Sequence, residues 1–299
     1  MAGLFILIET RAAEPILPLS LYGNLVVSIS MLITFLTGFS MFGAILFVPL
    51  FFQGVLGRSA TSSGSFLTPM MLGIVVGAAL SGQALSRFGG RYRLLGLVGL
   101  GIMALGMFLV SQMNEGTGFG AAVVYLVVMG FGLGTTFPVF SIAIMNSVPY
   151  RLLGAATSYT QFFRSIGGTV GLALFGSVLA NRFASELLGG VSEGVKSVLS
   201  GEVLSNIAHN PQALVSPEAQ SELQTLFDAA GPEGAGMLPQ LMETLRSALS
   251  TAIAEVFLIG LAALVLSWLA TLFLKEIRVR TVAPGPAGPG PGEGVGENG

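Results

Sequence analysis

The stretch "QFFRSIGGTVGLALFGSV", Gln161 to Val178, decides the fold class of this chain. With its neighbours it forms an apolar run long enough to cross the hydrocarbon core of a bilayer, which takes about 20 helical residues. Backbone amides in hydrocarbon must be hydrogen-bonded within their own segment, so such a run is an α-helix. The stretch therefore predicts a transmembrane helix, and Arg164 places one full positive charge inside it.

The composition of the whole chain agrees with a membrane protein. Of its 299 residues 53% are hydrophobic and 9% are charged, and the mean hydropathy is +0.82. Such values are typical of chains that cross the bilayer several times. The net charge is −2 and no basic cluster with interleaved aromatic residues occurs, so we expect no nucleic-acid partner. Cys is absent and His209 is the single His, so we expect no disulfide, no metal centre and no cofactor.

Six apolar runs predict an all-α membrane protein with six transmembrane helices, at residues 25–52, 66–85, 94–112, 119–145, 153–180 and 252–274. Residues 1–24 are then a cytoplasmic lead-in that begins like the end of a truncated helix, and 25–180 hold five spans. Residues 181–250 are an acidic extracellular loop, 251–276 the last span, and 277–299 a Pro/Gly-rich disordered cytoplasmic tail.

The distribution of Lys and Arg predicts the orientation. With the N-terminus inside, eight of the 13 basic residues fall on the inner side and four on the outer side, with Arg164 in the membrane. Cytoplasmic loops carry the excess of basic residues, so both termini are expected in the cytoplasm. An intramembrane enzyme would need paired Asp residues, a Ser with a His, or a metal-binding pair within the spans, and the sequence has none. We therefore do not expect an enzyme.

Three separated stretches carry a resemblance to a known family. "FILIETRAAEPILPLSLYGN", "SGQALSRFGGRYRL" and "TSYTQFFRSIGGTVGLALFGSVLANRF" resemble, in this order, the C-terminal half of fourteen-helix drug:proton antiporters of the major facilitator superfamily, the EmrB/QacA type. The resemblance implies that the chain is a fragment, one six-helix lobe of a major facilitator fold built from two inverted three-helix repeats. The first, second, fourth and fifth helices would then border the central cavity.

The same resemblance implies a function. The chain would be part of a secondary active transporter of the plasma (inner) membrane that exports small hydrophobic or cationic compounds in exchange for protons. Its partners would be the lipid bilayer, the missing N-terminal lobe, which would supply most of the proton-coupling acids, and a small-molecule substrate. A non-transporting six-helix membrane subunit or scaffold is the alternative.

Arg164 is the first candidate site residue. Arg at a helix centre costs about 2.5–3.5 kcal/mol on insertion scales, which the Leu, Ile, Phe and Val residues of the span offset at about 0.3–0.6 kcal/mol each. Gln161 lies one turn away, and the pair resembles the family's Asn-x-x-Arg with Gln in place of Asn. Arg164 is expected either to line a wet cavity or couple helices, or to extend its long stem to the cytoplasmic interface.

The first span adds a mildly polar face. Ser30, Thr34, Thr37 and Met41 recur at offsets of four, three and four, which is the spacing of one helix face. We expect Thr34, Thr37 and Met41 to border the cavity. The alternative is that the hydroxyls hydrogen-bond the backbone of their own helix.

Small residues at intervals of four predict close helix packing, because they let two helix backbones approach each other. They are Gly73 and Gly77, Gly130 and Gly134, and Gly167 and Gly171. In the fourth span, Pro138 follows and frees a backbone carbonyl.

The connector "SRFGGRYRL" resembles the cytoplasmic loop signature of the superfamily. Its matching residues, expected to form a gating loop, are Gly82, Arg87, Gly89, Arg91 and Arg93. Ser86 stands where the family usually has Asp, which removes a carboxylate that would pair with an Arg. The alternative is that these arginines only fix the topology.

Overall fold

The computed structural model describes residues 23–59, 67–87, 91–199, 201–209 and 231–276, together with 221, 223–225 and 227. The expected lead-in up to residue 22 and the expected tail from residue 277 lie outside the described residues. Nine helices are seen within the described part: α2 (Leu25–Gly54), α4 (Leu67–Arg87), α5 (Tyr92–Ser111), α6 (Phe119–Ser147), the 3₁₀-helix η2 (Tyr150–Leu152), α7 (Leu153–Gly190), α8 (Glu193–Val198), α9 (Gly201–His209) and α11 (Gly231–Leu272).

Six of these helices are long and apolar enough to cross a membrane, namely α2, α4, α5, α6, α7 and α11. This confirms the all-α class with six spans. The first four begin and end within two residues of the bounds that hydropathy predicts. Hydropathy finds these ends because the short connectors turn the chain at once, with Gly and polar residues, as in "NEGTG".

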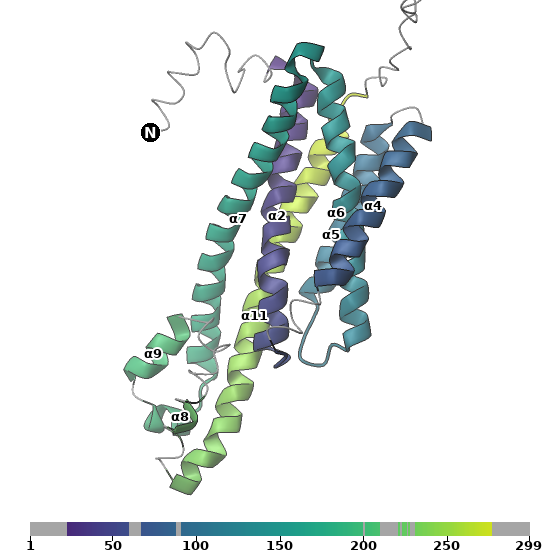
Figure 1. The fold of residues 1–299 in the computed structure, drawn as a ribbon. Coiled ribbons are helices and arrows are strands. Elements are labelled where there is room, and N and C mark those ends of the chain that lie inside the picture. Colours follow the sequence, from purple (N-terminus) through teal and green to yellow (C-terminus); the bar gives the residue numbers. More distant parts are fainter. Residues whose placement is uncertain are drawn as a thin grey trace, which may run out of the picture.

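The last two spans are longer than hydropathy predicts. α7 continues past Ala180 to Gly190, and α11 begins at Gly231 rather than near residue 252. Figure 1 shows the ends of α7 and α11 reaching beyond α2, with α8 and α9 beside them. Residues 181–250 are therefore not one loop, because the two spans continue as helices into both of its ends.

A small apolar core holds this extension together, which explains why the helices continue where charges lower the hydropathy. Its buried side chains include Leu187 of α7, Leu204 of α9 and Leu241 of α11, with Val191 and Phe227 between the helices. Residues 221, 223–225 and 227, which also belong to this part of the chain, are helical.

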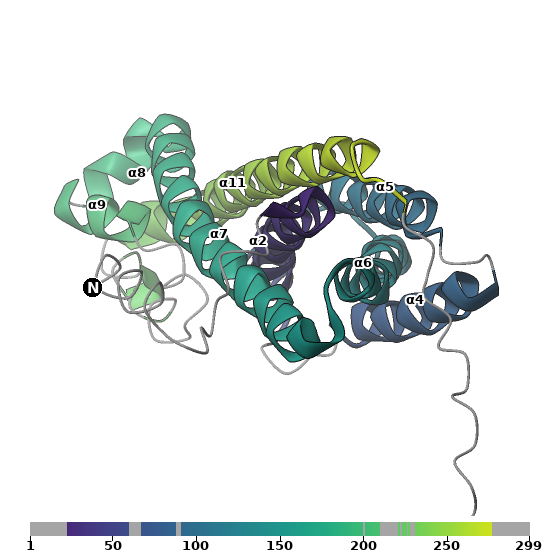
Figure 2. The same ribbon diagram turned by 90° about the horizontal axis from the view of Figure 1, so that it is seen from above.

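The contacts among the six spans repeat with inverted order. α2 packs against α7 and α11, whereas α6 packs against α4 and α5, and α5 also contacts α11. The two groups of three helices correspond when α2 is paired with α6, α4 with α7 and α5 with α11. Under this pairing the contacts of α2 with α7 and α11 become the contacts of α6 with α4 and α5, as two three-helix repeats require. Seen from above, α5 and α11 lie on one side of α2 and α6, while α4 and α7 flank them toward the opposite side (Figure 2).

Glycines let the backbones of α2 and α7 come into direct contact. A Cβ at Gly38 would come within 3.0 Å of the backbone of Arg164. Gly167 and Gly171 likewise face the backbone of Phe35 and Phe39. Van der Waals packing drives helix association in lipid, so glycines at these positions let the two backbones touch.

The same kind of glycine contact occurs between α4 and α6. Gly73 and Gly77 face the backbone of α6 at Val127 and Phe131. Gly130 and Gly134 of α6 face the backbone of α4 at Met70 and Ile74. A Cβ at any of these four glycines would come within 3.0 Å of the backbone of the opposite helix. All six glycines predicted to pack helices thus lie at the two equivalent helix crossings.

The two repeats are also joined at the end where α2 begins. The Asn24 side chain accepts a hydrogen bond from the Val26 amide at 3.0 Å and so caps α2. Its amide nitrogen donates to the Ser147 carbonyl at the end of α6, at 2.8 Å. One side chain therefore satisfies backbone groups at two helix ends that would otherwise lack partners.

The glycine contacts lead to a first prediction with a control on the same helix. Gly167→Ala should lower the stability of the folded chain by about 1–3 kcal/mol, because the new methyl group overlaps the α2 backbone. Gly176→Ala should leave stability unchanged or slightly higher, because nothing lies within 4 Å of a Cβ there and Ala is the better helix former. Thermal unfolding of both variants in detergent measures the difference, and equal midpoints would contradict the packing role.

Candidate functional site

Arg164 lies on α7 where this helix crosses α2 and approaches α6. Its backbone rests against Gly38 of α2. By the helical rise, Arg164 is about 17 Å from the start of α7 at Leu153, roughly halfway across the hydrocarbon core. The charge thus lies within the predicted span 153–180, closer to its Leu153 end.

The guanidinium of Arg164 points to α6. Its central carbon lies 4.1 Å from the ring centroid of Phe137, the distance of a cation–π contact. The side chain is half-buried, and Nε is buried without a hydrogen-bond partner in the described part of the chain. The Arg164 side chain of α7 thus contacts α6, and the cavity or helix-coupling role of Arg164 and Gln161 stays a prediction.

No carboxylate balances this charge among the described residues. The ion pairs found there are Arg182 with Glu186 at 3.2 Å and with Glu255 at 2.8 Å, and Lys196 with Glu193 at 2.8 Å. Arg182 lies about 27 Å further along α7 than Arg164, by the helical rise. The carboxylates of these ion pairs therefore belong to the far end of α7, where α8, α9 and the start of α11 also lie.

Aromatic rings surround the charged position on its own helix. Phe163 stacks on Tyr159 with ring centroids 6.2 Å apart and planes at 11°. Phe162 meets Phe163 edge to face at 5.9 Å. One turn beyond Arg164, Gly168 faces the ring of Phe42 on α2. These rings pack along α7 near Arg164, whereas the ring in contact with the guanidinium itself is Phe137 of α6.

The exposed half of α7 carries two parallel stripes. Ser158, Gln161, Ser165 and Thr169 recur at offsets of three, four and four, and all four are exposed. Beside them runs an exposed apolar stripe at offsets of four, made of Phe162, Ile166, Val170 and Leu174. Gln161 was expected from the sequence, whereas Ser158, Ser165 and Thr169 were missed. Their spacing at offsets of three, four and four would have predicted one polar helix face, but the glycines at 167 and 171 drew the prediction toward helix packing.

The polar residues of α2 point inward. The Thr34 hydroxyl donates to the Ser30 carbonyl at 2.8 Å, and the Thr37 hydroxyl donates to the Thr34 carbonyl at 3.0 Å. Both side chains are buried within the lobe, and half-buried Met41 packs against its hydrophobic core. The two hydroxyls thus serve the backbone of their own helix, and a cavity role for Thr34, Thr37 and Met41 stays a prediction.

The expected gating loop joins α4 to α5. Arg87 and Arg91 are exposed, Gly82 and Arg93 are half-buried, and Gly89 lies outside the described residues. None of the ion pairs in the described part includes these arginines. Ser86, where the family usually has Asp, lies in the last turn of α4, and its hydroxyl donates to the Gln83 carbonyl at 2.7 Å. The gating role stays a prediction.

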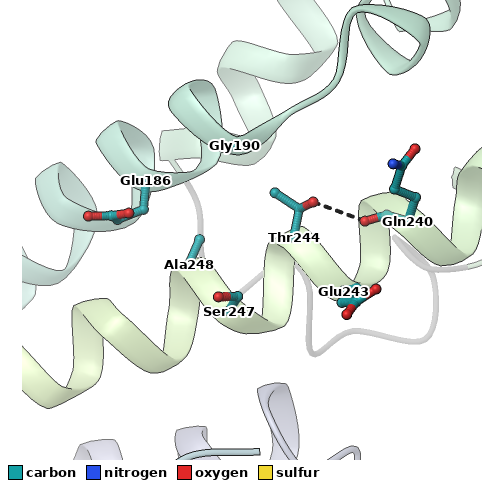
Figure 3. A pocket seen from close by; sticks show the side chains of 7 residues that line it. All are labelled: Glu186, Gly190, Gln240, Glu243, Thr244, Ser247 and Ala248. Carbon is teal, nitrogen blue, oxygen red and sulfur yellow. Dashed lines mark hydrogen bonds between the residues drawn. The ribbon is translucent and has the colours of Figure 1, made fainter.

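A polar cleft lies at the far end of α7 and α11. It measures about 420 Å³ and is lined by Glu186, Gly190, Gln240, Glu243, Thr244, Ser247 and Ala248. Figure 3 shows the hydrogen bond in it, which the Thr244 hydroxyl donates to the Gln240 carbonyl at 2.9 Å. No cluster of three His, Cys, Asp or Glu side chains suited to a metal ion occurs in the parts of the chain that the structure describes. The cleft is a hollow between the far ends of α7 and α11.

Six membrane-length helices in two inverted repeats, with a charge on an open face, are typical of one lobe of a secondary transporter. Residues 7–172 match the model of the Major Facilitator Superfamily. The chain belongs to this superfamily, whose members are membrane transporters and not enzymes.

Curated relatives extend the comparison beyond the matched residues. The chain is 33% identical over 277 residues to the multidrug transporter protein MdtP of Bacillus subtilis, covering 92% of this chain and 50% of that protein. It is 32% identical to multidrug resistance protein 3 of the same organism, covering 93% and 51%. It is also 32% identical to the tetracenomycin C resistance and export protein of Streptomyces glaucescens, covering 60% and 33%. The chain thus spans about half the length of the first two relatives.

Proposed function

We propose that this chain is one lobe of a secondary active transporter that exports small hydrophobic compounds in exchange for protons. The observation that carries the proposal is the half-length match to multidrug transporters, combined with a six-helix lobe of inverted repeats. Two such lobes rock around a substrate site between them near the bilayer midplane. Arg164, about 17 Å from the start of α7 by the helical rise, would lie near that depth, next to α2 and α6.

The outward faces of α4 and α7 support a second lobe as partner. α4 exposes Met71, Leu72, Val75, Val76 and Leu80, and α7 exposes its apolar stripe. In Figure 2 both helices flank α2 and α6 on the side away from α5, and α7 meets α11 at its far end. They would contact the missing lobe and lipid, while α5 and α11 would lie against the bilayer.

The source of the proton coupling lies outside this chain in our proposal. Coupling needs a carboxylate that titrates in the pathway. Glu255 is the carboxylate nearest to the interior of a span among the described residues, and it is ion-paired to Arg182 at the far end of α7. We therefore assign the coupling acids to the other lobe. A non-transporting subunit is the competing function.

Reconstitution separates the two functions. Liposomes that contain the chain with its complementary lobe should export a hydrophobic dye when a pH gradient is applied, and should stop when a protonophore collapses it. Liposomes with the chain alone should insert it but show no gradient-driven export, because nothing can rock against it. Gradient-driven export by the chain alone would contradict the one-lobe assignment, and no export by the complete protein would favour the subunit.

The orientation is a further part of the proposal, with both termini and the α4–α5 connector in the cytoplasm. It rests on the eight basic residues on that side. The absence of native Cys makes single-cysteine labelling clean. A Cys at position 209 should react with an impermeant maleimide in intact cells, whereas a Cys at position 87 should react only after permeabilisation. The reverse pattern would invert the topology.

A further inference from the structure

Arg164 places a positive charge on the open face of the lobe, and the transport function proposed above gives this charge no role. Arg164 lies in a membrane-length helix, with Nε buried and without an acceptor in the described residues. A cation in a low-dielectric site is stable only with a negative partner or with water. Because the side chain is half-buried, its guanidinium can be reached by water or by an oxyanion from the open side of the lobe.

The surroundings of the Arg164 guanidinium indicate which kind of oxyanion it can bind. The guanidinium carbon of Arg164 lies over the Phe137 ring, 4.1 Å from its centroid, and the N–H donors on its half-buried, open side remain available to an acceptor. Guanidinium binds carboxylate-like oxygens in its plane through two parallel hydrogen bonds. The Phe137 ring also gives the guanidinium an aromatic, apolar neighbour. An aromatic neighbour of this kind favours a flat, largely apolar molecule.

The polar stripe of α7 gives such a molecule further hydrogen-bonding groups. Gln161 and Ser165 flank Arg164 on the exposed half of the helix. The Thr169 hydroxyl donates to the Ser165 carbonyl at 3.0 Å, which leaves its lone pairs as acceptors toward the open side. A molecule that approaches Arg164 thus meets amide and hydroxyl groups along one edge and hydrocarbon along the other.

We propose that Arg164 binds an acidic oxygen of the transported compound, so that this lobe favours flat hydrophobic substrates with a carboxylate, phenolate or enolate over cationic ones. The inference rests on the proposed transport function and replaces the cationic class that the sequence resemblance implies. A carboxylate of the complementary lobe could supply the same chemistry. The two sources differ in one measurable respect, because a substrate oxyanion matters only for substrates that have one.

The test compares two dyes that share a xanthene ring system, fluorescein as the anion and rhodamine 123 as the cation. KM and kcat for both are measured in liposomes with the complete transporter. Arg164→Gln should raise KM for fluorescein at least tenfold and leave KM and kcat for rhodamine 123 within twofold of wild type. Arg164→Lys should fall between, because it keeps the charge and loses the planar pair of donors.

Two controls keep the result interpretable. Arg182→Gln removes a charge from the same helix at its far end, and it should leave the preference between the dyes unchanged. Arg164→Gln should also unfold at a temperature no lower than wild type, because its charge has no ion-pair partner among the described residues. The effect on KM then reports binding and not damage to the fold.

Three outcomes would overturn the inference. An equal slowing of both dyes in Arg164→Gln would assign Arg164 to a carboxylate of the complementary lobe. An unchanged KM for fluorescein, or a wild-type protein that transports rhodamine 123 alone, would remove the oxyanion site. If the wild-type protein moves neither these dyes nor any hydrophobic dye, the proposed transport function itself fails, which is a separate result.

Discussion

The close backbone contact between α2 and α7 is the constraint on which the rest of the site depends. Lipid chains are as apolar as Leu, so burial alone gives two membrane helices little reason to associate. Gly38, Gly167 and Gly171 let the backbones touch and gain packing energy instead. The equivalent contact of α4 with α6 repeats the solution, so the fold uses one type of interface twice.

This contact also determines where the charge goes. Because the Arg164 backbone rests on Gly38, its side chain emerges at the edge of the α2–α7 crossing and meets Phe137 of α6. A larger residue at position 38 would move α7 away and break the contact with α6. The glycine packing and the position of the guanidinium are therefore two results of one contact.

Much of this fold could be predicted from the sequence, because a bilayer forces each apolar run to be a helix. The runs predicted the six spans, and glycines at intervals of four predicted close helix packing, while the partners α2 with α7 and α4 with α6 came from the structure. The length of α7 and α11 could not be predicted, because helices outside the hydrocarbon are stabilised by packing partners such as Leu204 and Phe227, which hydropathy does not report.

The candidate site was only partly predictable. Arg164 stood out because a charge in a span is expensive. Spacing alone could not tell whether Thr34 and Thr37 face a cavity or their own backbone, since both use the same helix face. It also did not single out Ser158, Ser165 and Thr169, whose exposure depends on which side of α7 packs against α2.

The central claim is that the polar stripe of α7, with Arg164 at its edge, borders a water-filled pathway while the neighbouring apolar stripe does not. A cysteine scan along α7, in a complete transporter free of other Cys, tests it with an impermeant thiol reagent that reacts only in water. The account predicts modification at positions 158, 161, 165 and 169 and protection at 162, 166, 170 and 174. Equal modification of both stripes, or modification of the apolar one alone, would contradict it.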